Sequence, residues 1–235
     1  MLKRFKSRWS LQDAPVGSEP RQDLAAADVT RGFKLLARHL RSEGNGAGVS
    51  QPVRIVVAGD VVGLLLLNTR AATATADFFA RTGEDLRAVL GAKRAVLNDL
   101  RMHSNWLSAQ IVHDLDHDPR FDSLYNESVA QNVVLFSSDV LVVYAVDLRY
   151  QLIAMLQRLQ DREYVYELAE GAPMDPQLAD AVAALHVLIQ RRKGALIGLK
   201  ELKSWYGLGE KLELTTFSML STAYVDIHDT DGLVL

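Results

Sequence analysis

One segment, residues 53–79, constrains the fold more strongly than any other part of the sequence. Val53 to Ala58 is a short apolar run rich in β-branched residues, which is typical of a mostly buried strand. Gly59 interrupts this run, Val61 to Asn68 then predicts a buried helix, and Thr73 to Phe79 predicts a second strand. We therefore expect an α/β protein that is built around a strand–turn–helix–strand unit.

Helices and a hairpin are predicted around this unit. Thr82 and Asp85 form a capping box, and Asp175-Pro176 is a strong helix start that Gly194 ends. In chain order, the predicted elements are a helix from residue 28 to the glycine-rich loop 44–48, a helix from 82 to 100, a short element within 105–115, a hairpin of strands 133–136 and 140–146, helices at 152–159, 176–193 and 199–206, and an edge strand within 222–234.

These elements predict the organisation of the chain. Residues 1–27 are polar and contain two prolines and a glycine, which favours a flexible tail. We expect residues 28–235 to form a single domain with a core at 53–146 and a helical C-terminal part at 147–235. The fold class is thus α/β, more finely α+β, with a mixed sheet and flanking helices. A hydrophobic fraction of 49% in 235 residues is enough for such a core.

The amino-acid composition argues against several classes of function. The net charge of −3 gives no general attraction to nucleic acid, so we expect no nucleic-acid partner. The absence of cysteine excludes disulfides and thiolate chemistry. No apolar run approaches the ~18–20 residues of a membrane span, which predicts a soluble, cytoplasmic protein. The basic N-terminus lacks the apolar stretch of a secretory signal, and a mitochondrial presequence is the alternative for it.

The segments Val57-Ala58-Gly59-Asp60 and Arg70 to Asp77 resemble the signature of the nucleotidyltransferase fold. That signature is an apolar strand ending in Gly-Gly or Gly-Ser, a helix, and a strand that carries Asp-x-Asp. The resemblance is closest to the minimal, antitoxin-associated branch and to related uncharacterised fungal proteins. It covers residues 53–205 and implies a nucleotidyltransferase-like domain. Further matching stretches are 105–107, 131–136, 143–145 and 155–159.

The positions that carry the chemistry of this family are changed. Active members hold divalent ions with two acids on one face of a strand, whereas here Thr75 precedes Asp77. Asp60 occupies the turn where a small residue would let backbone N–H groups approach phosphate, and its charge would repel that phosphate. The helical lysine of the family is replaced by Met155. We therefore expect neither a metal nor a cofactor.

Asp77 and Asp60 are the candidate catalytic residues. If the two carboxylates face each other, they could act as an acid and base pair. The structural alternatives are a solvated relic for Asp77, a turn-forming side chain for Asp60 and a structural ion pair with Asp77 for Arg70. The aromatic candidates could equally belong to the core. The candidate ligand-binding residues are Gly59, Arg70, Thr75, Trp106, Phe136, Tyr144, Tyr150 and Met155.

Histidines offer a weaker alternative site. His113 and His117 have the spacing of a metal-binding pair on a helix, with Asp114 or Asp116 to assist. The surrounding turn-forming residues and Asp118-Pro119 instead favour an exposed surface segment. A structural role is expected for His186, which lies inside a predicted helix.

Three functions fit these residues. The first is a degenerate nucleotidyltransferase-fold protein that binds a small, largely apolar molecule. It would act as a metal- and cofactor-independent cyclase, isomerase or pericyclase, resembling a Diels–Alderase, in a fungal secondary-metabolite pathway. The second is a residual magnesium-dependent nucleotidyltransferase that uses Asp77. The third is a non-catalytic, antitoxin-like or partner-binding protein. Whether the chain is an enzyme, and whether it is a homodimer, stays open at this point.

Overall fold

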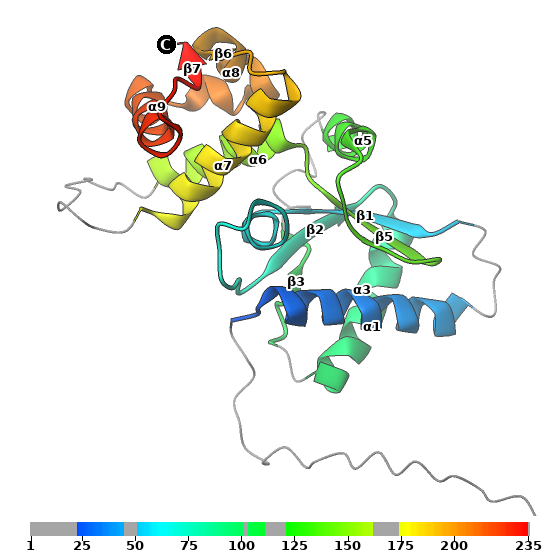
Figure 1. Ribbon diagram of the computed structural model, residues 1–235. Helices are drawn as coiled ribbons and strands as arrows, with labels where there is room; N and C mark the ends of the chain where they lie inside the picture. The colour runs from blue at the N-terminus through cyan, green and yellow to red at the C-terminus, as the bar shows by residue number, and fades with distance from the viewer. Residues whose placement is uncertain (1–22, 45–50, 101–102, 111–120, 162–173, 235) are drawn as a thin grey trace, which may run out of the picture.

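The computed structural model of the protein describes residues 23–44, 51–100, 103–110, 121–161 and 174–234. At its centre lies a five-stranded mixed sheet with the strand order β3-β2-β1-β5-β4 (Figure 1). β1 runs parallel to β5 and antiparallel to β2, so the strands predicted within 53–79 form the middle of the sheet. The strands are β1 (Val53–Ala58), β2 (Ala76–Ala80), β3 (Leu107–Ser108), β4 (Val134–Ser137) and β5 (Leu141–Ala145).

An irregular helical connection joins β1 to β2. It begins as α2 (Asp60–Val62) and continues as a π-helical turn, η1 (Gly63–Leu67). Asn68 ends it in a left-handed conformation with φ of 56°. Val61, Val62 and Leu64 are buried, since the C-terminal helices pack over this connection. The predicted buried helix is therefore present, although much of it is not regular α-helix.

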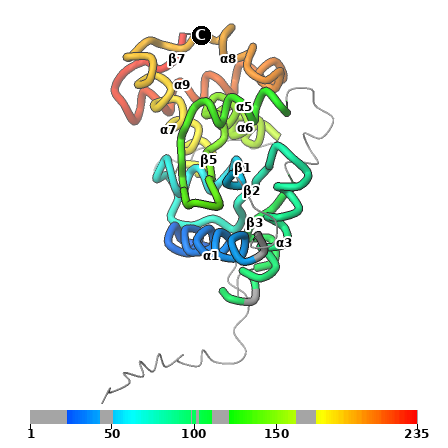
Figure 2. Tube along the Cα trace, turned by 90° about the vertical axis from the view of Figure 1, so that its right-hand side faces the viewer, coloured from blue at the N-terminus to red at the C-terminus, as the bar shows by residue number. Residues whose placement is uncertain are grey.

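Helices cover both faces of the sheet (Figure 1, Figure 2). Two of them pack against each other on one side, where Phe33 contacts Trp106 and Phe136 with ring centres 6.2 and 6.0 Å apart. A third lies on the opposite side together with the C-terminal part of the chain. These helices are α1 (Ala26–Gly44) and α3 (Gly83–Leu100) on the first side and α5 (Phe121–Gln131) on the second.

The contacts of Phe79 show on which face of the sheet the Asp77 side chain lies. Phe79 contacts Phe121 and Tyr125 of α5, with ring centres 5.4 and 6.3 Å apart. Side chains two residues apart on a strand point to the same face. Asp77 therefore faces the side of the sheet that α5 and the C-terminal helices cover.

The C-terminal part is mainly helical and packs around α6 and α7. The Asp147 and Asp175 carboxylates cap these two helices by accepting hydrogen bonds from Arg149 N and Gln177 N, at 2.9 and 2.7 Å. The elements are α6 (Leu148–Gln160), α7 (Pro176–Arg191), β6 (Ile197–Gly198), α8 (Leu199–Ser204), η2 (Trp205–Gly207), η3 (Gly209–Lys211), α9 (Leu214–His228) and β7 (Leu233–Val234).

The predicted α/β class, with a mixed sheet and a helical C-terminal half, is confirmed. The capping box is formed, because Thr82 Oγ1 donates to Asp85 and accepts from its backbone N–H, at 2.8 and 3.0 Å. Gly194, with φ of 86°, follows α7 as expected. Within the described part of the chain, no helix is long and apolar enough to cross a bilayer.

The edge strand predicted within 222–234 is wrong. Most of that segment belongs to α9, and only its end forms β7, which pairs with β6 in a separate two-stranded sheet. Tyr224 in this segment continues the buried stripe of Phe217 and Leu220, and the spacing of the three residues is helical.

Two further boundaries differ from expectation. Part of the predicted tail is ordered, because Leu24 is buried and exchanges two backbone hydrogen bonds with Thr73, at 2.8 and 3.0 Å. α1 begins at Ala26 rather than at residue 28. The helix α5 was not predicted, since its apolar residues are few. The segment that holds His113 and His117 lies outside the described residues.

Candidate functional site

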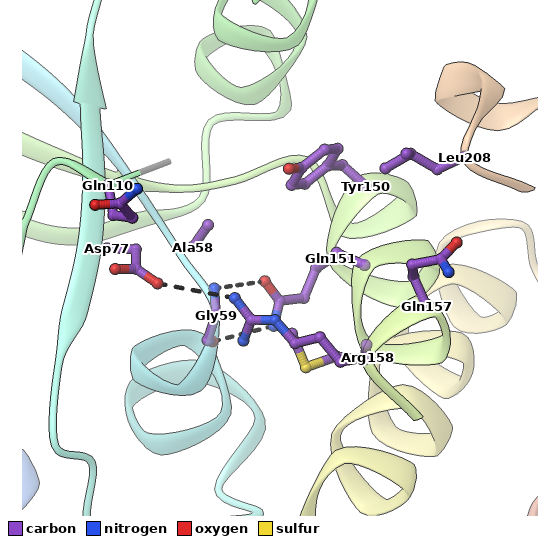
Figure 3. Close-up of a pocket in the computed structure, with 11 residues that line it drawn as sticks. Ala58, Gly59, Asp77, Gln110, Tyr150, Gln151, Gln157, Arg158 and Leu208 are labelled. Carbon is purple, nitrogen blue, oxygen red and sulfur yellow. Dashed lines mark hydrogen bonds and ion pairs between the residues drawn. The ribbon is translucent and has the colours of Figure 1, made fainter. Parts of the chain in front are cut away.

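A pocket of about 290 Å³ lies where the end of β1 and the start of β2 meet α6 (Figure 3). Its volume is near the lower limit of ligand sites, about 300 Å³. Charged and amide side chains gather around Asp77, whereas alanine, methionine and leucine side chains form the other part of the wall. The lining residues are Ala58, Gly59, Asp77, Gln110, Tyr150, Gln151, Ala154, Met155, Gln157, Arg158 and Leu208.

The turn after β1 is clamped by a side chain from α6. Gly59 N–H donates to Gln151 Oε1 at 3.0 Å, and Gln151 Nε2 donates to the Gly59 carbonyl at 3.1 Å. Gln151 is fully buried. Gly59 has φ of 78° and ψ of −145°, a conformation that is essentially restricted to glycine. Both backbone polar groups of the turn are thus satisfied within the protein.

Asp60 and Asp77 flank one guanidinium group. Arg158 on α6 lies 3.6 Å from Asp60 Oδ1 through Nη1 and 3.8 Å from Asp77 Oδ2 through Nη2. The two carboxylates predicted to be catalytic therefore lie near the same place, with the Arg158 guanidinium between them. Figure 3 shows the contact of Arg158 with Asp77. A Cβ atom at Gly59 would lie 3.5 Å from both Arg158 and Asp77, so the glycine turn packs closely against the pair.

A second arginine extends this arrangement into the interior. Arg70 donates from Nη1 to Asp60 at 3.1 Å and from Nε to Asp180 on α7 at 2.7 Å. Asp180 is fully buried and also accepts a hydrogen bond from the Thr69 hydroxyl. Burial raises the pKa of Asp180, while the hydrogen bonds from Thr69 and Arg70 act in the opposite direction. The acids and bases alternate in the order Asp180, Arg70, Asp60, Arg158, Asp77.

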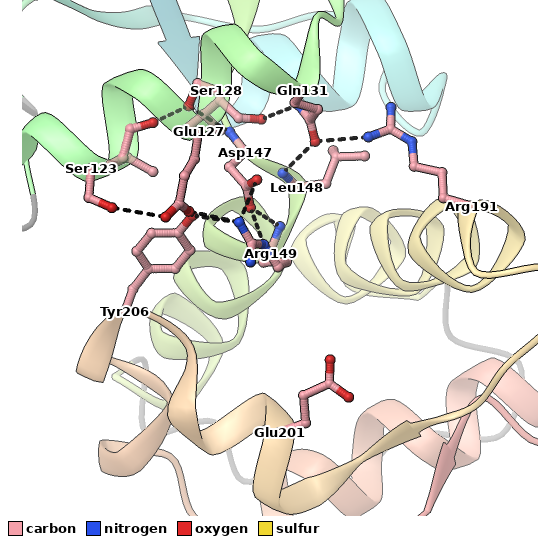
Figure 4. Close-up of polar contacts among 12 residues, drawn as sticks. Ser123, Glu127, Ser128, Gln131, Asp147, Leu148, Arg149, Arg191, Glu201 and Tyr206 are labelled. Carbon is pink, nitrogen blue, oxygen red and sulfur yellow. Dashed lines mark hydrogen bonds and ion pairs between the residues drawn. The ribbon is translucent and has the colours of Figure 1, made fainter.

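The far wall of the pocket is held by a polar network at the start of α6 (Figure 4). The Tyr206 hydroxyl donates to Glu127 of α5, and Arg149 Nη2 donates to the same carboxylate at 2.7 Å. The Tyr206 ring stands edge-on to Tyr150, with centres 5.5 Å apart. Burial, followed by the hydrogen bond to Glu127, raises the pKa of Tyr206. The network joins α5, α6 and η2 beside the pocket residues Tyr150 and Leu208.

The structure brings about half of the predicted site residues together. Asp77, Gly59, Tyr150 and Met155 line the pocket. Asp60 lies beside it through its ion pair with Arg158. Arg70 forms ion pairs with Asp60 and Asp180, whereas the alternative weighed for it was an ion pair with Asp77.

The remaining candidates lie elsewhere. Trp106 and Phe136 pack against Phe33 in the core beneath the other face of the sheet. Tyr144 is buried in β5, opposite Val134 in the register of the hairpin. Thr75 precedes β2, and its backbone N–H and carbonyl both bond to the Thr73 hydroxyl. The three aromatic residues occupy core positions, which is the structural alternative weighed for them, whereas Thr75 lies in a turn.

His186 likewise has neighbours away from the pocket lining. Its Nδ1 lies 3.1 Å from the Tyr224 hydroxyl, and its ring stacks on that of His228 with centres 4.0 Å apart. Burial, followed by the charge of His186, lowers the pKa of His228. These contacts join α7 to α9, in agreement with a structural role.

Sequence reasoning found Tyr150 and Met155 on α6 but missed other pocket residues of that helix. Gln151, Ala154 and Arg158 are spaced three and four residues apart, so they share one face of the helix. Their signal in the sequence is a glutamine and an arginine seven residues apart, which places both side chains on one face of a helix. Gln110 and Gln157 complete the polar part of the pocket and carry no comparable signal.

The residues do not fit a two-metal nucleotide site. Arg158 stands between the two carboxylates, Thr75 offers no carboxylate two residues before Asp77, and the Gly59 N–H of the turn donates to Gln151. Across the described residues, no group of three or more His, Asp or Glu side chains is placed to hold a metal ion. A cation between two acids is instead an arrangement that neutralises charge inside the protein.

A family model described as a domain of unknown function (DUF7582) matches residues 91–224. Because this match covers more than half of the chain, the protein belongs to that family. The matched region includes α6 and hence Gln151 and Arg158, whereas Asp60 and Asp77 precede it. No curated protein and no solved structure matches the chain.

Proposed function

We propose that the protein binds a small, largely apolar organic molecule in the pocket beside Asp77 and catalyses its isomerisation or cyclisation without metal or cofactor. We further propose that the scaffold is a nucleotidyltransferase-like fold with a changed active site. The strand–turn–helix–strand order of β1, α2, η1 and β2, with Asp77 next to the Gly59 turn, supports this relationship.

The clamp between Gln151 and Gly59 is the observation that carries the proposal. A turn that cradles phosphate needs N–H groups that point to the ligand. Here the Gly59 N–H donates to a buried amide side chain, and the next residue is Asp60. Removing Gln151 from this position would leave the buried Gly59 N–H without a partner, whereas the Gly59 carbonyl would keep its hydrogen bond from Val62 N–H at 3.0 Å.

The lining of the pocket supports an apolar ligand with a single polar end. Ala154, Met155 and Leu208 offer contact to a carbon skeleton, while Asp77 and Arg158 offer a carboxylate and a guanidinium at one end. Such a pocket can promote an isomerisation or a ring closure by holding reacting atoms together away from water. The resemblance to fungal proteins suggests a secondary-metabolite pathway as the setting.

Thermal unfolding tests the exclusion of nucleotide. A ligand of the native state raises the melting temperature by mass action. We expect millimolar ATP or CTP with magnesium to leave the melting temperature unchanged, with and without a chelator. A saturable increase that needs magnesium and is lost in Asp77→Asn would instead establish the residual nucleotidyltransferase and overturn the proposal.

A further inference from the structure

The polar end of the pocket pairs a hydrogen-bond donor with a base. Arg158 and Asp77 point toward each other from α6 and β2 (Figure 3). We infer that the ligand carries a carbonyl group with an acidic C–H bond beside it, that Arg158 binds the carbonyl oxygen, and that Asp77 removes the proton. This inference rests on the proposed function and names its substrate class and reaction.

The geometry of Arg158 makes it a suitable donor. Its distances of 3.6 and 3.8 Å to the two carboxylates exceed those of hydrogen bonds, so these contacts are electrostatic. The side chain is 43% exposed, whereas Asp77 is 23% exposed. The guanidinium is thus held in place by charge, and its N–H groups can turn to an acceptor in the pocket.

Local charge favours a neutral carbonyl over an anion. A phosphate or carboxylate bound to Arg158 would also approach Asp60 and Asp77, which carry the same sign of charge. A ketone oxygen accepts a hydrogen bond from the guanidinium without this repulsion. The apolar wall formed by Ala154, Met155 and Leu208 then contacts the carbon skeleton of the ketone.

The step is a proton transfer. A carboxylate oxygen of Asp77 takes the proton, the electron pair of the broken C–H bond forms a C=C bond, and the carbonyl π pair moves to oxygen. Arg158 stabilises the negative charge that develops there. Protonated Asp77 then returns the proton to the same carbon or, in an unsaturated ketone, to the γ carbon. Electrons and protons balance, and the second outcome is an isomerisation.

The test uses 2-tetralone as the ketone and tetralin as its hydrocarbon analogue, with the full chain. Proton NMR in D₂O follows the exchange of the ketone α-protons, and ligand-observed NMR titration gives affinities. We expect the protein to accelerate exchange and Asp77→Asn to reduce this acceleration by at least about 100-fold while 2-tetralone still binds. Arg158→Gln should weaken 2-tetralone binding and slow exchange by a similar factor, but leave tetralin binding unchanged.

Arg192→Gln is the matched control, because Arg192 has similar exposure and pairs with Glu201 at 2.7 Å outside the pocket. It should behave as the unaltered protein. If both compounds bind but Arg158→Gln affects them equally, or exchange is not accelerated, the carbonyl inference is overturned and the binding proposal stands. If neither compound binds, the carbonyl inference and the binding proposal are both overturned.

Discussion

At the scale of single residues, Gln151 holds the turn that defines the site. Replacing it with Leu keeps its approximate volume but leaves the Gly59 N–H buried without a partner, while the Gly59 carbonyl keeps its hydrogen bond from Val62 N–H. Since such a group costs about 1–3 kcal/mol, we expect Gln151→Leu to lower the free energy of unfolding by about that amount in urea titrations.

Gln190→Leu is the control for this change, because Gln190 is exposed near the end of α7. It should alter stability by less than about 0.5 kcal/mol. Equal effects of the two substitutions would show that the clamp on Gly59 contributes nothing specific.

The buried Asp180 carboxyl makes the free energy of unfolding depend on pH. Its pKa is raised by burial, so the folded state holds the proton more tightly than the unfolded state. Unfolding therefore releases a proton between the ordinary pKa and the raised one, and the contribution of Asp180 to stability falls as pH rises through that window.

Asp180→Asn removes this titration. We expect the stability of the unaltered protein, relative to Asp180→Asn, to decrease from about pH 4 upward and then become constant once the pH exceeds the raised pKa. Urea unfolding across this range measures the difference. A difference that grows with pH would show that the ion pair with Arg70 outweighs burial.

At the scale of elements, η2 directly precedes Leu208 in the pocket wall, and its residue Tyr206 contacts α5 and α6. Tyr206 has a left-handed backbone with φ of 53°, which is unfavourable for a bulky residue. Its hydroxyl bond to Glu127 and its ring contact with Tyr150 offset this strain.

Tyr206→Phe should loosen that wall. Loss of a hydrogen bond to a carboxylate is expected to increase amide hydrogen exchange at residues 205–208 roughly tenfold. Tyr224→Phe, which removes a hydroxyl beside His186, should leave exchange there unchanged. Unchanged exchange in Tyr206→Phe would mean that the hydroxyl does not hold η2.

α7 packs closely against η1 because residue 63 is a glycine, which has no Cβ atom. A Cβ atom at Gly63 would lie 2.5–2.9 Å from the Asp180 carboxylate. Gly63→Ala is therefore expected to destabilise the protein by about 1–3 kcal/mol in urea unfolding. At Gly198 nothing lies within 4 Å of such an atom, so Gly198→Ala should have an effect of less than about 0.5 kcal/mol. Equal effects would contradict this packing account.

At the scale of the whole molecule, the sequence predicts local structure better than it predicts which segments meet. β1, the capping box of α3 and the Asp175 cap of α7 follow from periodicity and capping residues alone. α9 was misread because its Thr and Val residues suggest a strand, and burial against α6 and α7 decides otherwise.

The same limit applies to the site. Asp60 and Asp77 could be found in the sequence because they belong to one strand–turn–helix–strand unit. Arg158 and Gln151 come from a helix about 80 residues later, so only tertiary packing brings them to the turn. The resemblance to the nucleotidyltransferase signature predicted a missing acid and a missing lysine, but it did not predict the arginine that stands between Asp60 and Asp77.

Blocking the pocket with a larger side chain tests the central claim most directly. Ala154 lines the apolar wall, whereas Ala195 is exposed outside the pocket lining. Saturation-transfer NMR with a library of neutral carbonyl fragments and with magnesium ATP would be recorded for the unaltered protein, Ala154→Phe and Ala195→Phe. We expect neutral fragments to bind the unaltered protein and Ala195→Phe but not Ala154→Phe, and no signal from ATP. Binding of ATP that Ala154→Phe abolishes, or fragment binding that it leaves intact, would contradict the account.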